Sequence, residues 1–295
     1  MESAEEYPEG QRCLAAFSRI QGKKPFEEVK AAFEKMVFQA GFMFEFWESY
    51  VLYLLRQNMA DWAYDAVSVA QEVYPDCLML DRLGALCCLE LADLGLAERH
   101  IKRFWGVNPW DPFIMLGYAQ VAFKKQEYQL SAMLYGEYME HGDTSYSVMQ
   151  EYAVALAYLH RFEEAVQVYL RMDSSYGPRA AIFNNIGMAL AGLGRFQEAT
   201  EYCRKALNLD SAYTAAWDSL GFAYLRMGRY EDAIPVFLKA IELEPNFPDA
   251  WRHLLHAYHN AGDDEKLSGA RSWVEGILPG ELARFERERG KELLD

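Results

Sequence analysis

The chain has 295 residues, and 52% of them are hydrophobic, which is enough to build a continuous core. Its 44 Asp and Glu residues outnumber its 29 Lys and Arg residues, and the net charge of −15 disfavours binding to a nucleic-acid backbone. The five cysteines are odd in number and show no C-x-x-C metal spacing, so we expect reduced thiols and a cytoplasmic location.

The N-terminal sequence predicts an acidic tail over residues 1–9 and no export signal. It reads MESAEEYPE, with four glutamates where a secretory signal needs a basic start and an apolar stretch. The most apolar window of the chain covers residues 41–55 and contains Glu45 and Glu48. This window is too short and too charged to span a bilayer, so we expect no membrane insertion.

A step of 34 residues divides the chain into eight predicted helix pairs. Their limits lie near 10–43, 44–77, 78–111, 112–145, 146–179, 180–213, 214–247 and 248–281. The first pair has a weak pattern, with Phe17 and Ile20 followed by Val29 and Phe33. An atypical terminal unit is expected, because its outer face meets water instead of another pair.

The next four pairs place small and apolar residues at matching positions. The second pair has Trp47, Tyr50, Val51, Leu54, Ala63, Val67, Ala70 and Pro75, and the third has Leu80, Leu83, Gly84, Cys87, Ala97, Ile101, Phe104 and Pro109. The fourth pair is apolar or small in every slot. In the fifth, the turn at Leu159, His160 and Arg161 lacks the usual Gly, which leaves the register of the helix near 146–158 open.

The seventh pair carries the most complete pattern. It contains Trp217, Leu220, Gly221, Tyr224, Ala233, Phe237, Ala240 and Pro245, and Trp251 and Pro279 repeat the Trp and the Pro 34 residues later. Spacings of 3, 4 and 7 place the first four residues on one helix face, opposite the stripe of the second helix. Gly221 and Ala233 are small, so the two helices can approach closely. The series resembles the tetratricopeptide repeat family, whose pattern is W-x2-L-G-x2-Y, then A-x3-F, then P.

This resemblance implies an all-α fold. The expected architecture is a right-handed α-solenoid of about eight 34-residue helix-turn-helix units, followed by a capping helix over residues 282–295. Neither helix of a pair can bury its apolar stripe alone, so neighbouring pairs must stack. In such a stack the first helices of the pairs line a concave groove.

Side chains of the first helices that point away from the packing stripe are candidates for binding a peptide in this groove. Toward the C-terminus they are Asn184, Asn185, Met188, Asp218, Ser219, Phe222, Arg226, Arg252, His253 and His256. Asparagine is a poor mid-helix residue, and its amide can clamp an extended peptide backbone, as asparagines of some tetratricopeptide arrays do. The alternative is a solvated pair or a contact to the next helix. The arginines and histidines are candidates for binding a carboxylate, although the Lys and Asn set of the chaperone-binding carboxylate clamp is not present in these slots.

We find no catalytic motif and expect no enzymatic activity, cofactor or metal. The chain has no G-x-x-x-x-G-K-[ST], no G-x-S-x-G and no H-E-x-x-H. His253, His256 and His259 are three residues apart, but no further metal ligand lies nearby in the sequence, so we interpret them as polar lining of the groove.

The sequence therefore predicts a non-enzymatic adaptor or scaffold that binds a peptide or helical segment of a partner protein. One alternative is a self-assembling structural protein, a homo-oligomer joined through exposed apolar residues or terminal faces. A metal-dependent enzyme built on the histidines is a weaker alternative. The groove can also be filled by the chain's own acidic tail.

Overall fold

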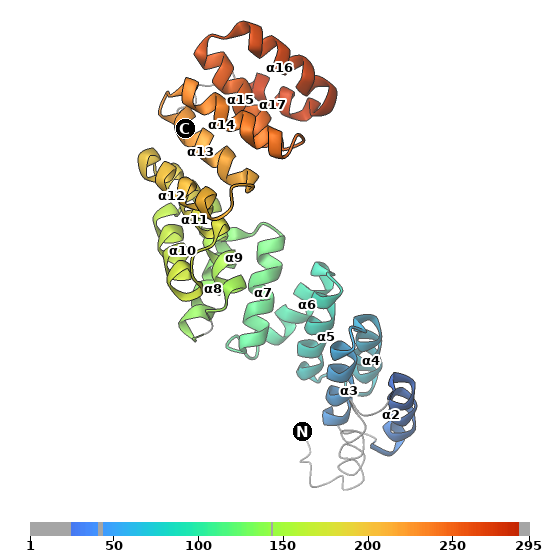
Figure 1. Cartoon of the computed structure of the whole chain (residues 1–295). Helices are drawn as coiled ribbons and strands as arrows, with labels where there is room; N and C mark the ends of the chain where they lie inside the picture. The colour runs from blue at the N-terminus through green and yellow to red at the C-terminus, as the bar shows by residue number, and fades with distance from the viewer. Residues whose placement is uncertain (1–24, 41–43, 143, 289–295) are drawn as a thin grey trace. The chain divides into compact units, whose positions relative to one another are not determined.

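The computed structural model describes residues 25–40, 44–142 and 144–288. Every regular element within these ranges is a helix and none is a strand, so the all-α prediction is confirmed (Figure 1). The acidic tail, the first helix of the 10–43 pair and the capping residues after 288 lie outside the described residues. None of the described helices combines the length and the apolar character needed to cross a membrane.

The chain divides into two compact units, residues 1–141 and 142–295. The helices described in the N-terminal unit are α2 (Phe26–Ala40), α3 (Phe44–Arg56), α4 (Ala60–Val73), α5 (Leu78–Glu90), α6 (Leu94–Trp105), α7 (Pro112–Lys124) and α8 (Tyr128–Glu140). Those of the C-terminal unit are α9 (Tyr146–Tyr158), α10 (Phe162–Tyr176), α11 (Ala180–Gly192), α12 (Phe196–Leu209), α13 (Thr214–Arg226), α14 (Tyr230–Leu243), α15 (Pro248–Ala261), α16 (Asp264–Ile277) and α17 (Pro279–Glu288).

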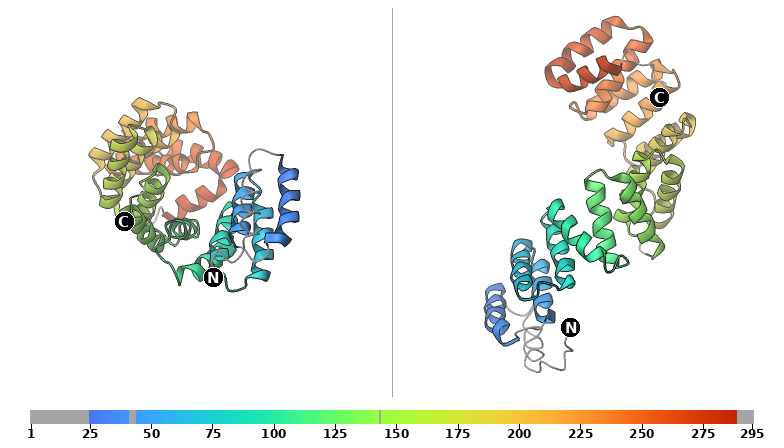
Figure 2. Two further views of the ribbon diagram at one scale, coloured as in Figure 1. Left: turned by 90° about the horizontal axis from the view of Figure 1, so that it is seen from below. Right: turned by 180° about the vertical axis from the view of Figure 1, so that it is seen from behind.

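Consecutive helices pack as pairs within each unit, and the pairs stack as expected for a tetratricopeptide-type solenoid (Figure 2). The first helices of adjacent pairs touch one another, as α5 does α7, α11 does α13 and α13 does α15. From α3 onward these first helices begin at residues 44, 78, 112, 146, 180, 214 and 248, which are 34 apart. The division into eight units between residues 10 and 281 stays a prediction.

The turn between the two helices of a pair is built in one way throughout. One residue in each turn has a positive φ, and these residues are Asn58, Ala92, Gln126, His160, Gly194, Gly228 and Gly262. In each case the following N–H donates to the carbonyl five residues before it, at 2.8–3.0 Å, as in a Schellman motif. The turn at His160 therefore has the same length as the glycine turns, and α9 begins at Tyr146 in register with the other first helices.

Close approach of the paired helices depends on small residues in the first helix. A Cβ at Gly221 would lie 2.5 Å from Cε1 of Phe237, and a Cβ at Gly187 would lie 2.7 Å from Sγ of Cys203. Phe237 is fully buried, as is Ala233 one turn before it. The predicted role of Gly221 and Ala233 thus has a direct counterpart in the packing of α13 against α14.

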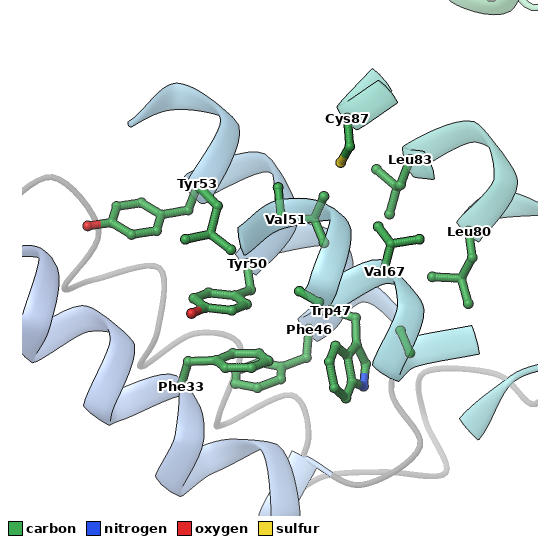
Figure 3. Packing of buried hydrophobic residues seen from close by; sticks show 14 of the residues in the cluster. Phe33, Phe46, Trp47, Tyr50, Val51, Tyr53, Val67, Leu80, Leu83 and Cys87 are labelled. Atoms are coloured by element: carbon green, nitrogen blue, oxygen red, sulfur yellow. The ribbon is translucent and has the colours of Figure 1, made fainter. Parts of the chain in front are cut away.

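The core of the N-terminal unit begins with an aromatic cluster (Figure 3). The ring of Phe33 on α2 stacks on Tyr50 of α3, with ring centroids 3.6 Å apart, and on Phe46 at 5.0 Å. Val29 and Phe33 of α2 are buried, although the repeat pattern there is weak. Aromatic pairs contribute stability beyond their buried area, so this cluster anchors α2 to the first strongly patterned pair.

Candidate peptide-binding site

The ten predicted site residues all lie on α11, α13 and α15, the successive first helices of the C-terminal unit. Because α11 contacts α13 and α13 contacts α15, the fold brings these residues onto neighbouring helices. Their burial differs widely, however, and their contacts divide them into three groups.

Asn184 and Met188 form the first group, together with Asn185. Asn184 is only 2% exposed, whereas the Met188 side chain is 56% exposed and Asn185 is half-buried. The Asn184 amide Nδ2 donates to Sδ of Met188 at 3.7 Å, and its buried Oδ1 has no hydrogen-bond partner in the ranges that the structure describes. A thioether is a weak acceptor, so the amide of Asn184 keeps most of its hydrogen-bonding capacity unused. An unpaired buried acceptor costs about 1–3 kcal/mol.

The second group lies on α13 and includes a paired carboxylate and a stacked guanidinium. His253 on α15 donates from Nδ1 to Oδ1 of Asp218 at 2.8 Å, and Asp218 and Ser219 are buried. Arg226 is half-buried, with its guanidinium carbon 5.4 Å from the ring centre of Phe196 and 5.8 Å from that of Phe222. Rings at these distances attract a cation and hold it in place.

Arg226 forms no ion pair with a residue in the part of the chain that the structure describes, whereas six of the eleven described arginines of the C-terminal unit do. Its guanidinium therefore presents unused donors beside two aromatic rings. A guanidinium in this state can receive a carboxylate through two parallel hydrogen bonds.

The third group, Arg252 and His256 on α15, faces α17 instead of an open groove. Arg252 is 8% exposed, donates from Nε to Oε2 of Glu281 at 3.2 Å, and also pairs with Asp249 of its own helix. His256 is 2% exposed, and its Nε2 lies 3.2 Å from Oε2 of Glu288. These polar atoms are occupied by the chain itself, because α17 packs along α15.

Burial affects the protonation of His256 in its contact with Glu288. It lowers the pKa of His256 below the ordinary value of 6.5, although the hydrogen bond to Glu288 acts in the opposite direction. Phe285 of α17 is fully buried, and its ring meets the His256 ring edge-on with centroids 4.9 Å apart. The neutral imidazole is thus the form that this apolar contact favours.

The sequence predicts a capping helix over residues 282–295, but it did not predict that Glu281 and Glu288 engage Arg252 and His256. The signal was available, since Glu281, Phe285 and Glu288 are spaced by four and three residues and share one helix face.

The histidine series has no metal-binding arrangement around it: among the described residues, no group of three or more His, Cys, Asp or Glu is placed to hold an ion.

Comparison with known proteins agrees with the repeat architecture. The family model named tetratricopeptide repeat matches residues 178–243, and a second one, named TPR repeat, matches residues 226–262. Residues 178–262 therefore carry tetratricopeptide repeats. The tetratricopeptide fold supports a role in protein interaction in general. A search of curated proteins found no match.

Solved structures share the tetratricopeptide fold over more than half of the chain. "MamA 41-end from Desulfovibrio magneticus RS-1" is 20% identical with a TM-score of 0.52, and the match covers 58% of this chain and 97% of that one. "MamA MSR-1 C2" is 19% identical with a TM-score of 0.50, and the match covers 57% of this chain and 97% of that one. Identity at this level concerns the fold alone.

Proposed function

We propose that this tetratricopeptide-repeat chain is a non-enzymatic adaptor that holds a peptide segment of a partner protein along α11 and α13. The observation that carries the proposal is the buried Oδ1 of Asn184, which has no hydrogen-bond partner among the described residues, while Nδ2 of the same amide contacts the exposed side chain of Met188. Buried polar atoms without partners are rare in folded proteins, and a ligand that supplies the partner is one reason to retain them.

The proposed binding step begins at Met188. A methionine side chain is unbranched and adaptable, so it can move aside and pack against an apolar side chain of the peptide. Its displacement uncovers the amide of Asn184, next to Asn185 on the same helix. The two amides then exchange hydrogen bonds with main-chain N–H and C=O groups, which gives affinity without demanding one peptide sequence.

Arg226 and Phe222 define the other end of the proposed site. The guanidinium, held between Phe196 and Phe222, offers its donors to a carboxylate of the peptide, either a chain terminus or an acidic side chain. Arg252 and His256 do not touch this peptide in our proposal, because Glu281 and Glu288 of α17 already engage them. Asp218 and His253 act as a pair that fixes α13 against α15.

The expected affinity is modest. An extended peptide loses conformational freedom on binding, which offsets much of the contact energy, so a dissociation constant near micromolar, or about −8 kcal/mol, is expected. Such an affinity suits an adaptor that releases its partner again.

The test is capture of partners from a lysate of the source organism with three forms of the immobilised chain. These are the wild type, the double variant Asn184→Ala with Asn185→Ala, and the control Asn208→Ala, which removes an exposed asparagine from α12. We expect a protein that the wild type and the control retain equally and that the double variant captures at least about tenfold less. Equal capture by all three forms would exclude the two asparagines from the site.

A second variant, Arg226→Ala, tests the carboxylate. Once a captured partner is mapped to a peptide, removal of the peptide's acidic group should weaken binding to the wild type and leave binding to Arg226→Ala unchanged. If the two losses add instead, the guanidinium and the carboxylate do not meet.

A further inference from the structure

A second binding feature lies in the N-terminal unit and shares no residue with the candidate peptide-binding site. A cavity of about 180 Å³ opens between the end of α6, the loop that follows it, and helices α7 and α8. It is lined by Trp105, Pro109, Trp110, Met115, Met133, Leu134 and Glu137, which we call the Trp110 pocket. Trp110 and Met133 on its rim are each 59% exposed.

These two rim residues depart from the repeat. The residues at the position of Met133 in the other pairs, taken at steps of 34, are Ala31, Asp65, Arg99, Gln167, Glu201, Pro235 and Gly269. The residues at the position of Trp110 are Phe42, Asp76, Thr144, Pro178, Ala212, Asn246 and Gly280. Phe42, in the weakly patterned first pair, is the one other large apolar residue at either position. Packing within the repeat therefore does not require Trp110 or Met133, and exposure of both is a cost that a docking function explains.

The charge of the pocket also departs from the repeat. Five other pairs carry a basic residue at the position of Glu137, namely Lys35, Arg103, Arg171, Lys205 and Lys239. The carboxylate of Glu137 lies 3.9 Å from Nε2 of His141, a side chain that is charged only when protonated. The His141 ring also meets Trp110 edge-on, with centroids 5.6 Å apart. The apolar pocket is thus bordered by an acidic group at a position where most other pairs carry a basic residue.

The size of the cavity limits what can enter it. Pockets that take drug-sized ligands or cofactors measure about 300–1,000 Å³, so a cavity of about 180 Å³ suits one apolar side chain. A second copy of this chain is a poor occupant, because two chains of net charge −15 repel each other and the rim is itself acidic.

We propose that the Trp110 pocket docks a segment of a partner protein that carries one large apolar side chain, with a Lys or Arg within one helical turn of it. The apolar side chain enters between Trp110 and Met133, and the cation pairs with Glu137. Tryptophan and methionine are enriched at protein–protein interfaces, and the acidic rim selects basic segments over acidic ones. This site is independent of the asparagines of α11, so the chain has two separate docking surfaces.

The experiment uses the full-length chain and a phage-displayed library of random peptides. Peptides are selected on the wild type and counter-selected on Met133→Glu, which removes those that bind elsewhere. Binding of a selected, fluorescein-labelled peptide is then measured by fluorescence anisotropy with the wild type, Met133→Glu, Glu137→Lys and the control Leu238→Glu. Leu238 is an exposed apolar residue of α14, 43% exposed, and lies outside the pocket.

We expect selected peptides to share a large apolar residue and a neighbouring Lys or Arg. Met133→Glu should weaken binding at least about tenfold, and Leu238→Glu should change it less than about twofold. Glu137→Lys should weaken binding as well, and replacement of the peptide's cation by Glu should restore it, because the charge pair is then reversed. Thermal melting of each variant confirms that the fold is kept.

Three results would overturn the proposal. The first is a selection that enriches no peptide dependent on Met133. The second is a set of peptides without a shared cation, or with a cation whose reversal Glu137→Lys fails to rescue. The third is concentration-dependent self-association of the wild type that Met133→Glu abolishes, which would assign the pocket to a second copy.

Discussion

Replacing Gly221 with Ala tests whether close approach of two helices is what the repeat pattern encodes. The added Cβ would lie 2.5 Å, 2.7 Å and 2.9 Å from three ring carbons of Phe237, and that ring is fully buried. Overpacking of a core costs about 1–3 kcal/mol. Alanine in a helix interior is worth about 1 kcal/mol over glycine. Because the ring has no route to solvent, we expect a net loss of up to about 2 kcal/mol.

A matched control separates packing from helix propensity. Gly269 is an interior residue of α16, and a Cβ there would have no neighbour within 4 Å. Gly269→Ala should therefore stabilise the C-terminal unit by about 1 kcal/mol. Urea denaturation followed by circular dichroism measures both variants, and each kcal/mol corresponds to about 2–4 °C in the melting temperature of a unit of this size.

The decisive measurement is the same substitution in a Phe237→Leu background. The smaller side chain leaves room for the new methyl group, so Gly221→Ala should no longer destabilise the protein there. The reasoning fails if Gly221→Ala is at least as stable as the wild type, or if its cost is unchanged in the Phe237→Leu background.

Three further predictions concern the turns, the α17 contact and the candidate site. Ala92 has a positive φ, so Ala92→Gly should gain up to about 1 kcal/mol, and Gly228→Ala should lose a similar amount, both read from urea midpoints. Because burial lowers the pKa of His256 below 6.5, the unfolded chain binds the proton of this side chain more readily than the folded chain does, so stability should fall as the pH drops below 6.5. In a series of urea midpoints measured against pH, His256→Gln should make this fall smaller. Asn184→Ala removes an unpaired buried acceptor, so it should raise the melting temperature while it weakens partner capture, and a lower melting temperature would mean that Asn184 is structural.

The fold could be predicted from the repeat spacing, because a helix pair needs particular small and large residues at fixed distances along the chain. Gly221 and Phe237 are such residues, and their pairing in space follows from the pattern alone. The pattern gives no signal where a residue other than glycine adopts the left-handed backbone conformation of the turn. At His160 the backbone adopts the left-handed conformation that glycine takes in later turns, and only the backbone itself shows this.

The sequence predicted which helices carry the candidate site residues, but not whether their side chains are open to a ligand. The step of 34 residues places Asn184, Asp218 and Arg252 on successive first helices, and the structure has them there. Whether each side chain is open to a ligand depends on what packs over it, and that comes from residues far along the chain. Arg252 pairs with Glu281 and Asp218 with His253, whereas Oδ1 of Asn184 has no hydrogen-bond partner in the described part of the chain.

The sequence alone thus determined which residues form helix pairs, because helical periodicity and the small-to-large pairing are local properties. The tertiary structure decided which polar groups remain unpaired and where a cavity opens beside Trp110. Burial and pairing depend on contacts between helices that are distant in sequence. The residues that determine how the two helices of one pair pack do not determine which side chains a neighbouring pair covers.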